Sequence, residues 1–324
     1  MDTVLITGGA GFVGSHCCKA FAAAGLTPIT YDDLSRGKKQ LVRWGPLEVG
    51  DIRDVTRLGE VFSKYSPVAV IHCAALAYVG ESVEKPVDYY SVNVGGTINL
   101  LETMLSHSVQ YLIFSSSCAI YGIPTKVPIF EDEMQVPINP YGHSKLMGEQ
   151  IIKDAANAKR LRYIGLRFFN VSGCDPDREI GEIHEPETHI IPRALMVAKG
   201  DLPFLEILGD DYDTPDGTCI RDYIHVSDLA EFHLKAMMKL KDEKLNACVN
   251  LGTGHGYSVK EVIQTAEKIT GRKIRVKVRE RRPGDPAILV SDPARAHALF
   301  GNLFKRSDLS TIIETQWSWI RSNS

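Results

Sequence analysis

Tyr141 and Lys145 stand four residues apart in the stretch Asn139–Lys145, and this pair carries the clearest chemical signal in the sequence. On a helix, side chains at positions i and i+4 lie on one face, about one turn apart. A free tyrosine has a pKa near ~10 and is a weak base at neutral pH, whereas a neighbouring ammonium group favours the phenolate. The pair therefore predicts a catalytic tyrosine that exchanges a proton with a substrate hydroxyl, with the lysine lowering the tyrosine pKa.

A run of serines offers a second hydroxyl for the same chemistry. Ser115 and Ser117 lie where a predicted strand, Tyr111–Ser115, ends. Ligands bind outside the carboxyl ends of strands in an open parallel sheet. We therefore expect Ser117 to act beside Tyr141 and Ser115 to face a bound cofactor. A turn held together by serine hydrogen bonds is the alternative interpretation.

A glycine-rich turn near the N-terminus predicts where that cofactor binds. The turn follows a short apolar strand and precedes an apolar helix at Val13–Phe21. Glycine permits the tight turn, lets backbone N–H groups approach a pyrophosphate, and lets the helix pack against the strand. The helix N-terminus adds a partial positive charge. The residues expected to hold a dinucleotide here are Gly8, Gly11, Phe12, Val13 and Gly14.

Carboxylates after the second predicted strand indicate which dinucleotide is bound. Asp32 lies 21 residues beyond Gly11 and is followed by Asp33. An acidic side chain at this spacing binds the adenosine ribose hydroxyls and repels a 2′-phosphate. The pattern favours NAD over NADP, although Arg36 close by could accept a 2′-phosphate. A turn-forming aspartate is the alternative interpretation of Asp32.

Further residues at predicted strand ends are expected to contact the same dinucleotide. The Asp51 carboxylate could bind the adenine amino group or could instead cap a helix that begins near Val55. Small residues after the fourth strand would let the backbone lie against the cofactor. The expected contacts from these segments are Asp51, Ile52, Cys73, Ala74, Ala75 and Asn93, which starts a long helix running to about Ser106.

The order of predicted elements indicates an α/β fold with a doubly wound parallel sheet of the Rossmann type and a smaller α+β C-terminal domain. From Asn170 onward the regular alternation gives way to longer loops and short strands. We expect a cofactor domain at 1–170, rejoined by a strand at 247–252, and a substrate-binding domain at 171–324. The first domain's predicted strands are Thr3–Thr7, Pro28–Asp32, Leu47–Val49, Val68–Cys73 and Tyr111–Ser115.

Composition excludes several other classes of protein. The 324 residues are 44% hydrophobic and 24% charged, with a net charge of -3, which is ordinary for a globular protein and provides no basic surface for nucleic acid or anionic lipid. No apolar run approaches membrane-spanning length, and the first strand begins too early for a signal peptide. Seven scattered cysteines without a C-x-x-C pair favour a reducing compartment. We expect a cytoplasmic protein.

The glycine turn, the serine run and the Tyr141/Lys145 pair resemble those of extended short-chain dehydrogenases/reductases. Further stretches narrow the resemblance, which covers nearly the whole chain, to the UDP-glucose 4-epimerase family. It implies a homodimer that pairs through two long helices at about 86–106 and 142–158. The stretches that carry it are Val79–Val83, Leu166–Asn170, Asp216–Val226 and Arg281–Asp285.

The resemblance implies a redox-neutral reaction on a UDP-sugar with tightly held NAD, most simply the interconversion of UDP-glucose and UDP-galactose. Tyr141, helped by Ser117, would remove the proton of the sugar 4-hydroxyl while the C4 hydride moves to the nicotinamide. The 4-keto sugar would turn over and take the hydride back on its other face. Lys145 would also hold the nicotinamide ribose.

The same resemblance assigns residues to the substrate. Arginine suits a diphosphate because its planar fork donates two parallel hydrogen bonds, although surface ion pairs are the alternative role for these arginines. Phe168 is implied as a further cofactor contact. The implied UDP-sugar contacts are Ser117, Tyr141, Asn170, His189, Arg221, Arg282, Asp285 and Leu289.

The sequence departs from the family pattern at several of these places. Ala77 stands where many members have a lysine near the nicotinamide, so that contact is missing or comes from Tyr78. Ala119 replaces a hydroxyl found in some members, which places more of the proton handling on Ser117. His189 replaces a frequent asparagine.

Related activities stay open. Leu289 lies at the family's size gate beside the sugar C2 substituent and should disfavour N-acetylated sugars by ~1–3 kcal/mol. The stretch Ala77–Ser82 also resembles UDP-xylose/UDP-arabinose 4-epimerases, and UDP-glucuronate is a further possible substrate. Dehydratases and decarboxylases of this fold carry an acidic residue where this chain has Cys118 and Ala119. A non-catalytic NAD-sensing protein would commonly lack the Tyr141/Lys145 pair.

The segment Glu182–His189 combines glutamates and histidines, but the sequence analysis predicts no metal site there. Pro186 interrupts any helix, and the spacing of His184 and His189 differs from that of an H-E-x-x-H motif. The expected structure is a solvated acidic loop near the substrate.

Overall fold

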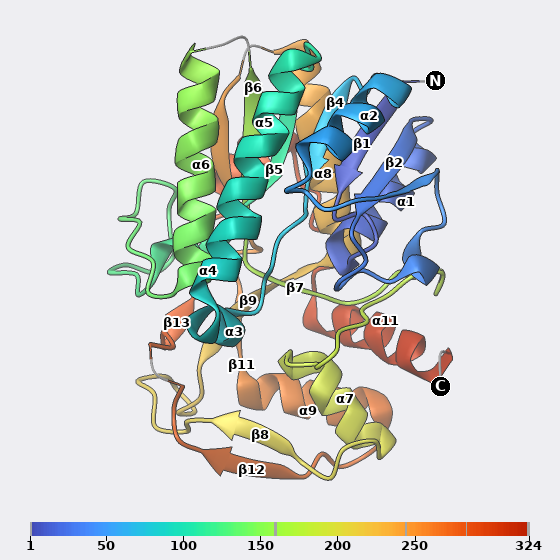
Figure 1. Cartoon of the computed structure of the whole chain (residues 1–324). Coiled ribbons are helices and arrows are strands. Elements are labelled where there is room, and N and C mark those ends of the chain that lie inside the picture. The colour runs from blue at the N-terminus through green and yellow to red at the C-terminus, as the bar shows by residue number, and fades with distance from the viewer. Residues whose placement is uncertain (1, 159–160, 244, 283, 323–324) are drawn as a thin grey trace. The chain divides into compact units, whose positions relative to one another are not determined.

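A computed structural model describes residues 2–158, 161–243, 245–282 and 284–322 (Figure 1). The chain divides into two compact units. Unit 1 comprises Met1–Gly122, Met134–Phe168 and Ala230–Val249, and unit 2 comprises Ile123–Glu133, Phe169–Leu229 and Asn250–Ser324. A single boundary at residue 170 would therefore assign 123–133 and 230–249 to the other unit. No described helix combines the length and the apolar character that crossing a membrane requires.

Unit 1 is built on a seven-stranded sheet of the predicted Rossmann type. Its strand order is β10-β6-β5-β4-β1-β2-β3, and the pairings from β3 through β6 are parallel. The order reverses between β1 and β4, which is where such sheets bind ligands. The strands are β1 (Thr3–Thr7), β2 (Thr27–Asp32), β3 (Leu47–Val49), β4 (Ala69–His72), β5 (Tyr111–Ser115), β6 (Arg162–Phe168) and β10 (Ala247–Leu251).

Most of these strands coincide with the predicted ones, including the returning strand at the sheet edge. β6 was not predicted, because Gly165 and Arg167 interrupt its apolar run, although five of its seven residues are buried. The structure gives Arg167 a buried ion-pair partner, so a charged residue can occupy a central strand.

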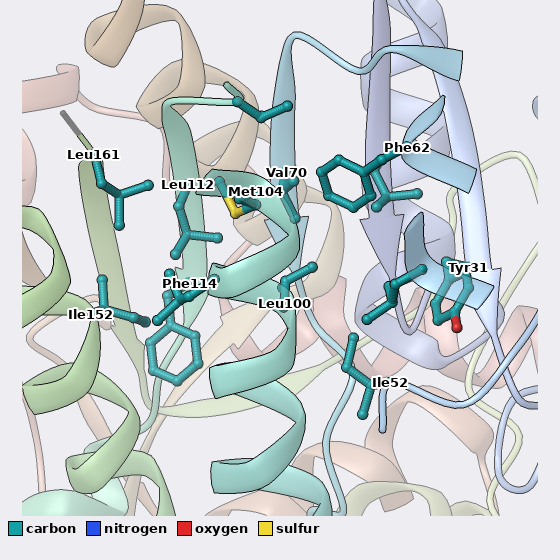
Figure 2. Close-up of a cluster of buried hydrophobic side chains, with 14 of the residues drawn as sticks. Tyr31, Ile52, Phe62, Val70, Leu100, Met104, Leu112, Phe114, Ile152 and Leu161 are labelled. Carbon is teal, nitrogen blue, oxygen red and sulfur yellow. The ribbon is translucent and has the colours of Figure 1, made fainter. Parts of the chain in front are cut away.

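Helices cover the sheet, and three of them share one apolar core. Figure 2 shows side chains of α2, α5 and α6 packed on residues that point from the strands to the same face. Fully burying one such side chain, for example Phe62 or Leu112, stabilises the fold by ~1.5–3 kcal/mol. The helices are α1 (Phe12–Ala23), α2 (Val55–Tyr65), α3 (Val79–Glu84), α4 (Pro86–Tyr89), α5 (Gly96–Ser106), α6 (Pro140–Ala158) and α8 (Val226–Asp242), with short turns η1 (Lys39–Leu41), η2 (Tyr90–Gly95) and η3 (Cys118–Tyr121).

Unit 2 contains a second small sheet, centred on β9, and a two-stranded parallel sheet of β8 and β12. Around β9 lie β7, β11 and β13, and α7, α9 and α11 bury a separate apolar core. α9 begins with a reciprocal capping box of Ser258 and Glu261. The elements are β7 (Asn170–Ser172), β8 (Leu205–Leu208), β9 (Ile220–His225), β11 (Gly256–Ser258), β12 (Val276–Arg279), β13 (Ile288–Leu289), α7 (Ile190–Lys199), α9 (Val259–Thr270), α10 (Ala294–Phe300) and α11 (Leu309–Ser322).

Candidate active site

The glycine turn connects β1 to α1 at the point where the strand order reverses. Gly8 has a positive φ of 71°, and a Cβ placed on it would lie 2.6 Å from the backbone nitrogen of Ala74. A Cβ on Gly14 would collide with the carbonyl oxygen of Gly8. Gly11 is the N-cap of α1 and offers no side chain to its first turn, which Phe12 opens. The turn thus exposes backbone rather than side chains, as a bound pyrophosphate requires.

Asp32 ties the end of β2 to this turn. Its carboxylate accepts hydrogen bonds from the backbone N–H groups of Ala10, at 3.0 Å, and Leu34, at 2.9 Å. Burial raises the pKa of Asp32. Arg36 was the residue that could accept the 2′-phosphate of NADP. It instead forms a 2.6 Å ion pair with Glu81 and lies over the ring of Tyr78. Both observations suit a site for NAD.

The remaining cofactor candidates lie at neighbouring strand ends. Cys73, Ala74 and Ala75 directly follow β4 and are half-buried. Asp51 binds the backbone N–H and the guanidinium of Arg53, at 2.6–3.1 Å, so it forms a local turn. The cap of α2 is instead Asp54. Three further candidates are placed as follows: Ile52 is buried, Asp33 is exposed, and Phe168 ends β6 half-buried.

Asn93 lies in a π-helical turn, η2, between α4 and α5 rather than at the start of a helix. Its side chain binds both backbone groups of Leu76, at 2.8 and 3.0 Å, and donates to the Ser144 hydroxyl at 2.9 Å. Asn93 is therefore a structural link between the segment after β4 and helix α6. The cofactor contact expected of Asn93 stays a prediction.

Helix α6 presents Tyr141 and Lys145 to the end of β5, as their spacing predicts. Ser117 acts on the Tyr141 hydroxyl and lowers its pKa, and the Lys145 Nζ donates to the carbonyl oxygen of Ser115 at 2.8 Å. Tyr141 is 8% exposed and Lys145 4% exposed. The Ser115 hydroxyl points elsewhere, to His233 Nε2 at 2.9 Å. Three sequence-predicted residues thus meet in one buried cluster.

Protonation in this cluster differs from the sequence-based expectation. Burial raises the pKa of Tyr141 to about 12, and the hydrogen bond from Ser117 lowers it only in part. Burial also lowers the pKa of Lys145 to about 8. In the protein without its cofactor the lysine does not offset this rise in the tyrosine pKa, because the Lys145 Nζ lies 5.9 Å from the centre of the tyrosine ring and donates to Ser115, so the lowering expected with the cofactor bound stays a prediction. Desolvation outweighs the distant charge.

One more buried residue on the same face of α6 was missed in the sequence analysis. Glu149 accepts hydrogen bonds from the Ser116 hydroxyl, at 2.5 Å, and from two nitrogens of Arg167. Arg167 also donates to the Tyr121 hydroxyl at 2.8 Å. The signal was present, because Glu149 continues the four-residue spacing of Tyr141 and Lys145.

In unit 2, the predicted UDP contacts gather around β9. Arg221 on β9 is in register with Leu289 on β13, and its Nη2 donates to Asp285 at 2.6 Å. Asn170 belongs to β7, which also pairs with β9. Arg282 is exposed, and Pro283 of the same motif lies outside the described residues. The sheet therefore groups most of these residues, although they are distant in sequence.

The segment Glu182–His189 is a loop that is only partly solvated, because Glu185, Pro186 and Thr188 are exposed whereas Glu182 is buried. Its two histidines and two of its glutamates converge, and the side chain of Glu182 is 1% exposed. Burial lowers the pKa of His189, but hydrogen bonds to Glu182 and Glu187 outweigh it and raise the pKa to about 10. The same balance raises the pKa of His184 to about 8. His189, a predicted substrate contact, is thus held by carboxylates at the N-cap of α7.

Comparison with known proteins agrees with this site. The pattern of the NAD dependent epimerase/dehydratase family matches residues 4–252. The UDP-glucose 4-epimerase of Rhizobium meliloti (strain 1021) is 46% identical over 98% of this chain and 97% of its own length. UDP-arabinose 4-epimerase 1 of Arabidopsis thaliana is 41% identical over 98% of this chain and 78% of its own. The crystal structure of UDP-glucose 4-epimerase from Brucella ovis in complex with NAD is 54% identical, with a TM-score of 0.96 over 98% of each chain. This chain therefore belongs to the NAD dependent epimerase/dehydratase family.

Proposed function

We propose that the chain is an NAD-dependent UDP-sugar 4-epimerase that interconverts UDP-glucose and UDP-galactose through a 4-keto intermediate. The observation that carries the proposal is the buried cluster of Ser117, Tyr141 and Lys145 at the end of β5. Relatives named UDP-glucose 4-epimerase, matched over nearly their full length, support it. The relative named UDP-arabinose 4-epimerase makes a pentose substrate the second candidate.

The residues of unit 1 fit NAD. Gly8 and Gly14 leave no room for side chains where backbone would meet a pyrophosphate, and the N-terminus of α1 favours its charge. Asp32 carries its carboxylate at the end of β2, where ribose hydroxyls bind. When bound, NAD would supply the hydride acceptor and donor of the reaction at its nicotinamide ring. Lys145 and Tyr141 would hold the ribose next to that ring.

Proton transfer in this proposal belongs to the protein. Tyr141 takes the proton of the 4-hydroxyl as the sugar is oxidised and returns it on reduction, and Ser117 orients the phenol oxygen. Positive charge in the site favours the phenolate over the neutral phenol. Lys145 carries such a charge at neutral pH, because its pKa of about 8 lies above 7.

Unit 2 supplies the candidates that would bind UDP. The Arg221 guanidinium is 8% exposed, and its ion pair with Asp285 fixes the orientation of its fork. Such a fork binds diphosphate oxygens bidentately. His189 adds a second positive charge, since its pKa is about 10. Asn170, Arg282 and Leu289 complete the proposed substrate contacts.

Replacing Tyr141 tests the mechanism. Tyr141→Phe keeps the ring but removes the oxygen that moves the proton, and losing a general base of this kind lowers kcat by a factor of ~10²–10⁴. Epimerisation of UDP-galactose by the purified chain, without added cofactor, measures the effect. Tyr111→Phe, at the opposite end of β5, is the matched control and should retain full activity. Equal rates for Tyr141→Phe and the unaltered chain, with equal NAD content, would refute the proposed role.

The charge of Lys145 predicts a pH dependence. With a pKa of about 8, the side chain is about nine-tenths charged at pH 7 and about one-tenth charged at pH 9. Lys145→Ala should therefore reduce kcat, relative to the unaltered chain, several-fold more at pH 7 than at pH 9. Lys235→Ala, which removes an exposed lysine of α8, is the control for general charge effects. If the relative loss were the same at both pH values, Lys145 would act as a ribose ligand and not through its charge.

The substrate pair is tested by a panel of UDP-galactose, UDP-N-acetylgalactosamine, UDP-xylose and UDP-glucuronate. We expect UDP-galactose to be preferred. Shortening Leu289 should relax the size limit, so Leu289→Ala should raise kcat/KM for the N-acetylated sugar relative to UDP-galactose by about tenfold or more. The neighbouring Ile288→Ala is the control, because adjacent strand residues point to opposite faces. A preference of the unaltered chain for UDP-xylose or UDP-glucuronate would assign it to a related epimerase activity.

We further propose that two copies of the chain pair through the helices of 86–106 and α6. Figure 1 shows α5 and α6 side by side in unit 1, and apolar side chains are exposed on this group of helices. Val87 is 76% exposed and Met147 is 44% exposed. Apolar side chains in contact with water cost free energy, and burying them in an interface would remove that cost. Val87→Asp should convert a dimer to a monomer in sedimentation equilibrium. Val278→Asp, at a valine of unit 2 that is 49% exposed, should not, and a monomeric unaltered chain would refute the proposal.

We propose the cytoplasm as the compartment. None of the seven cysteines, all of which lie in the described part of the chain, is joined in a disulfide, which agrees with a reducing environment. Labelling of these thiols in intact cells, before lysis, would test this placement: blocked thiols would contradict it.

A further inference from the structure

Four side chains of unit 2, Glu182, His184, Glu187 and His189, form a compact group that we call the His–Glu cluster. The Nδ1 atoms of both histidines face the same Glu182 oxygen, at 3.1 Å for His184 and 3.0 Å for His189. The Glu187 carboxylate contacts both histidines as well, with Oε1 at 2.8 Å from His189 Nδ1 and Oε2 at 3.7 Å from His184 Nδ1. One nitrogen or oxygen from each of the four residues lies within 4.8 Å of the other three.

These separations match the edges of a tetrahedral metal site. Zinc binds imidazole nitrogen and carboxylate oxygen at about 2.0–2.2 Å, so the ligand atoms of a tetrahedral site lie about 3.4 Å apart. The separations to Glu182 Oε1, 3.0 and 3.1 Å, are slightly shorter than that distance, and those to the two Glu187 oxygens, 2.8 and 3.7 Å, lie on either side of it. A cation could enter between the ligand atoms after shifts of a few tenths of an ångström. Two neutral imidazoles and two carboxylates would also balance its double charge.

An independent observation points to a missing ligand. The second oxygen of Glu182, Oε2, is buried and has no hydrogen-bond partner, while the side chain as a whole is only 1% exposed. A buried carboxylate oxygen without a partner costs free energy, because it has lost its water and gained nothing in exchange. A cation bound by Glu182 would neutralise that carboxylate.

The surrounding chain holds the cluster in place. The backbone N–H of Glu182 donates to Cys174 Sγ at 3.3 Å, and Cys174 is bound in turn to α11 through Thr315 and Gln316. Gly181 lies against the ring of Trp319, where a Cβ would collide. His189 is the N-cap of α7. Ligands fixed by both helices need little ordering on binding, which favours affinity.

We propose that the His–Glu cluster binds one divalent transition-metal ion of the zinc class, through the Nδ1 atoms of His184 and His189 and one oxygen each of Glu182 and Glu187. Mixed imidazole and carboxylate ligation favours zinc, cobalt or iron over calcium and magnesium, which prefer oxygen alone. The spacing of His184 and His189 did not predict this site, because it differs from that of the helical H-E-x-x-H motif. In the structure the ligands come from a loop and from the residue that caps α7.

The ion would also define the state of His189. Metal on Nδ1 would displace the proton that gives metal-free His189 its positive charge, so the positive charge would lie on the ion and the ring would keep one N–H donor, on Nε2. The His189 side chain is 43% exposed, which leaves that donor accessible. This consequence rests on the proposed UDP-binding role of His189, whereas metal binding itself does not.

Titration with Co²⁺, which occupies zinc sites and absorbs visible light, tests the inference on the full chain with its bound NAD after chelator treatment. We expect one equivalent to bind, with the absorption of tetrahedral nitrogen and oxygen ligation, and Zn²⁺ to displace it. Glu182→Gln and His184→Asn should each weaken binding by about tenfold or more. Asp177→Asn, in a nearby group of acidic residues, is the matched control and should leave binding unchanged.

Two results would overturn the proposal. One is a chain that binds no stoichiometric Co²⁺ or Zn²⁺. The other is undiminished binding by both Glu182→Gln and His184→Asn, with or without a loss in Asp177→Asn. Circular dichroism melting of the metal-free variants checks that each is folded. Metal stoichiometry is measured without any sugar substrate, so failure of the epimerase proposal would leave this test intact.

Discussion

Three consecutive serines at the end of β5 bind three polar side chains that one face of α6 buries. Ser117 pairs with Tyr141, the Ser115 carbonyl with Lys145, and the Ser116 hydroxyl with Glu149. Each of the three α6 side chains is at most 8% exposed, so an unpaired one would cost ~1–3 kcal/mol or more. The end of the strand and the helix must therefore keep one register. A shift of either would leave buried charges without partners.

The burial of these side chains also explains the shifted pKa values of Tyr141 and Lys145. Water is excluded from the cluster, so neutral forms are favoured: the tyrosine pKa rises to about 12 and the lysine pKa falls to about 8. The two shifts have the same cause, burial, and opposite directions because one group is an acid that becomes negative and the other a base that becomes positive. A further positive charge that binds in such a site lowers the tyrosine pKa more strongly than the same charge would in water. The protein alone thus keeps Tyr141 neutral, with its ionisation open to any positive charge that binds beside it.

Much of the fold followed from the sequence because its signals are local. The glycine turn, the strand ends and the Tyr141/Lys145 spacing each depend on a few adjacent residues, and the structure places them as expected. β6 was not predicted because Arg167 can be buried in it only through its ion pair with Glu149, which belongs to another element. The same reason applies to Asn93, whose side chain is occupied by Leu76 and Ser144. The role of a buried polar residue depends on partners that are distant in sequence. The hydrophobic periodicity of the sequence does not indicate which residues these partners are.

The residues around β9 show how pairing prepares a binding group. Arg221 would lose several rotatable bonds on binding a diphosphate, and ordering a long side chain costs ~1.5–2 kcal/mol. Here that ordering is already complete, because Nη2 is held by Asp285 at 2.6 Å and Nη1 by the carbonyl oxygen of Ile220 at 2.9 Å. In the proposed UDP-binding role, Asp285 would assist binding without touching the ligand, since it fixes the arginine's remaining donors. The register of Leu289 with Arg221 then sets an apolar side chain beside a fixed charge, which is the combination that a sugar joined to a diphosphate requires.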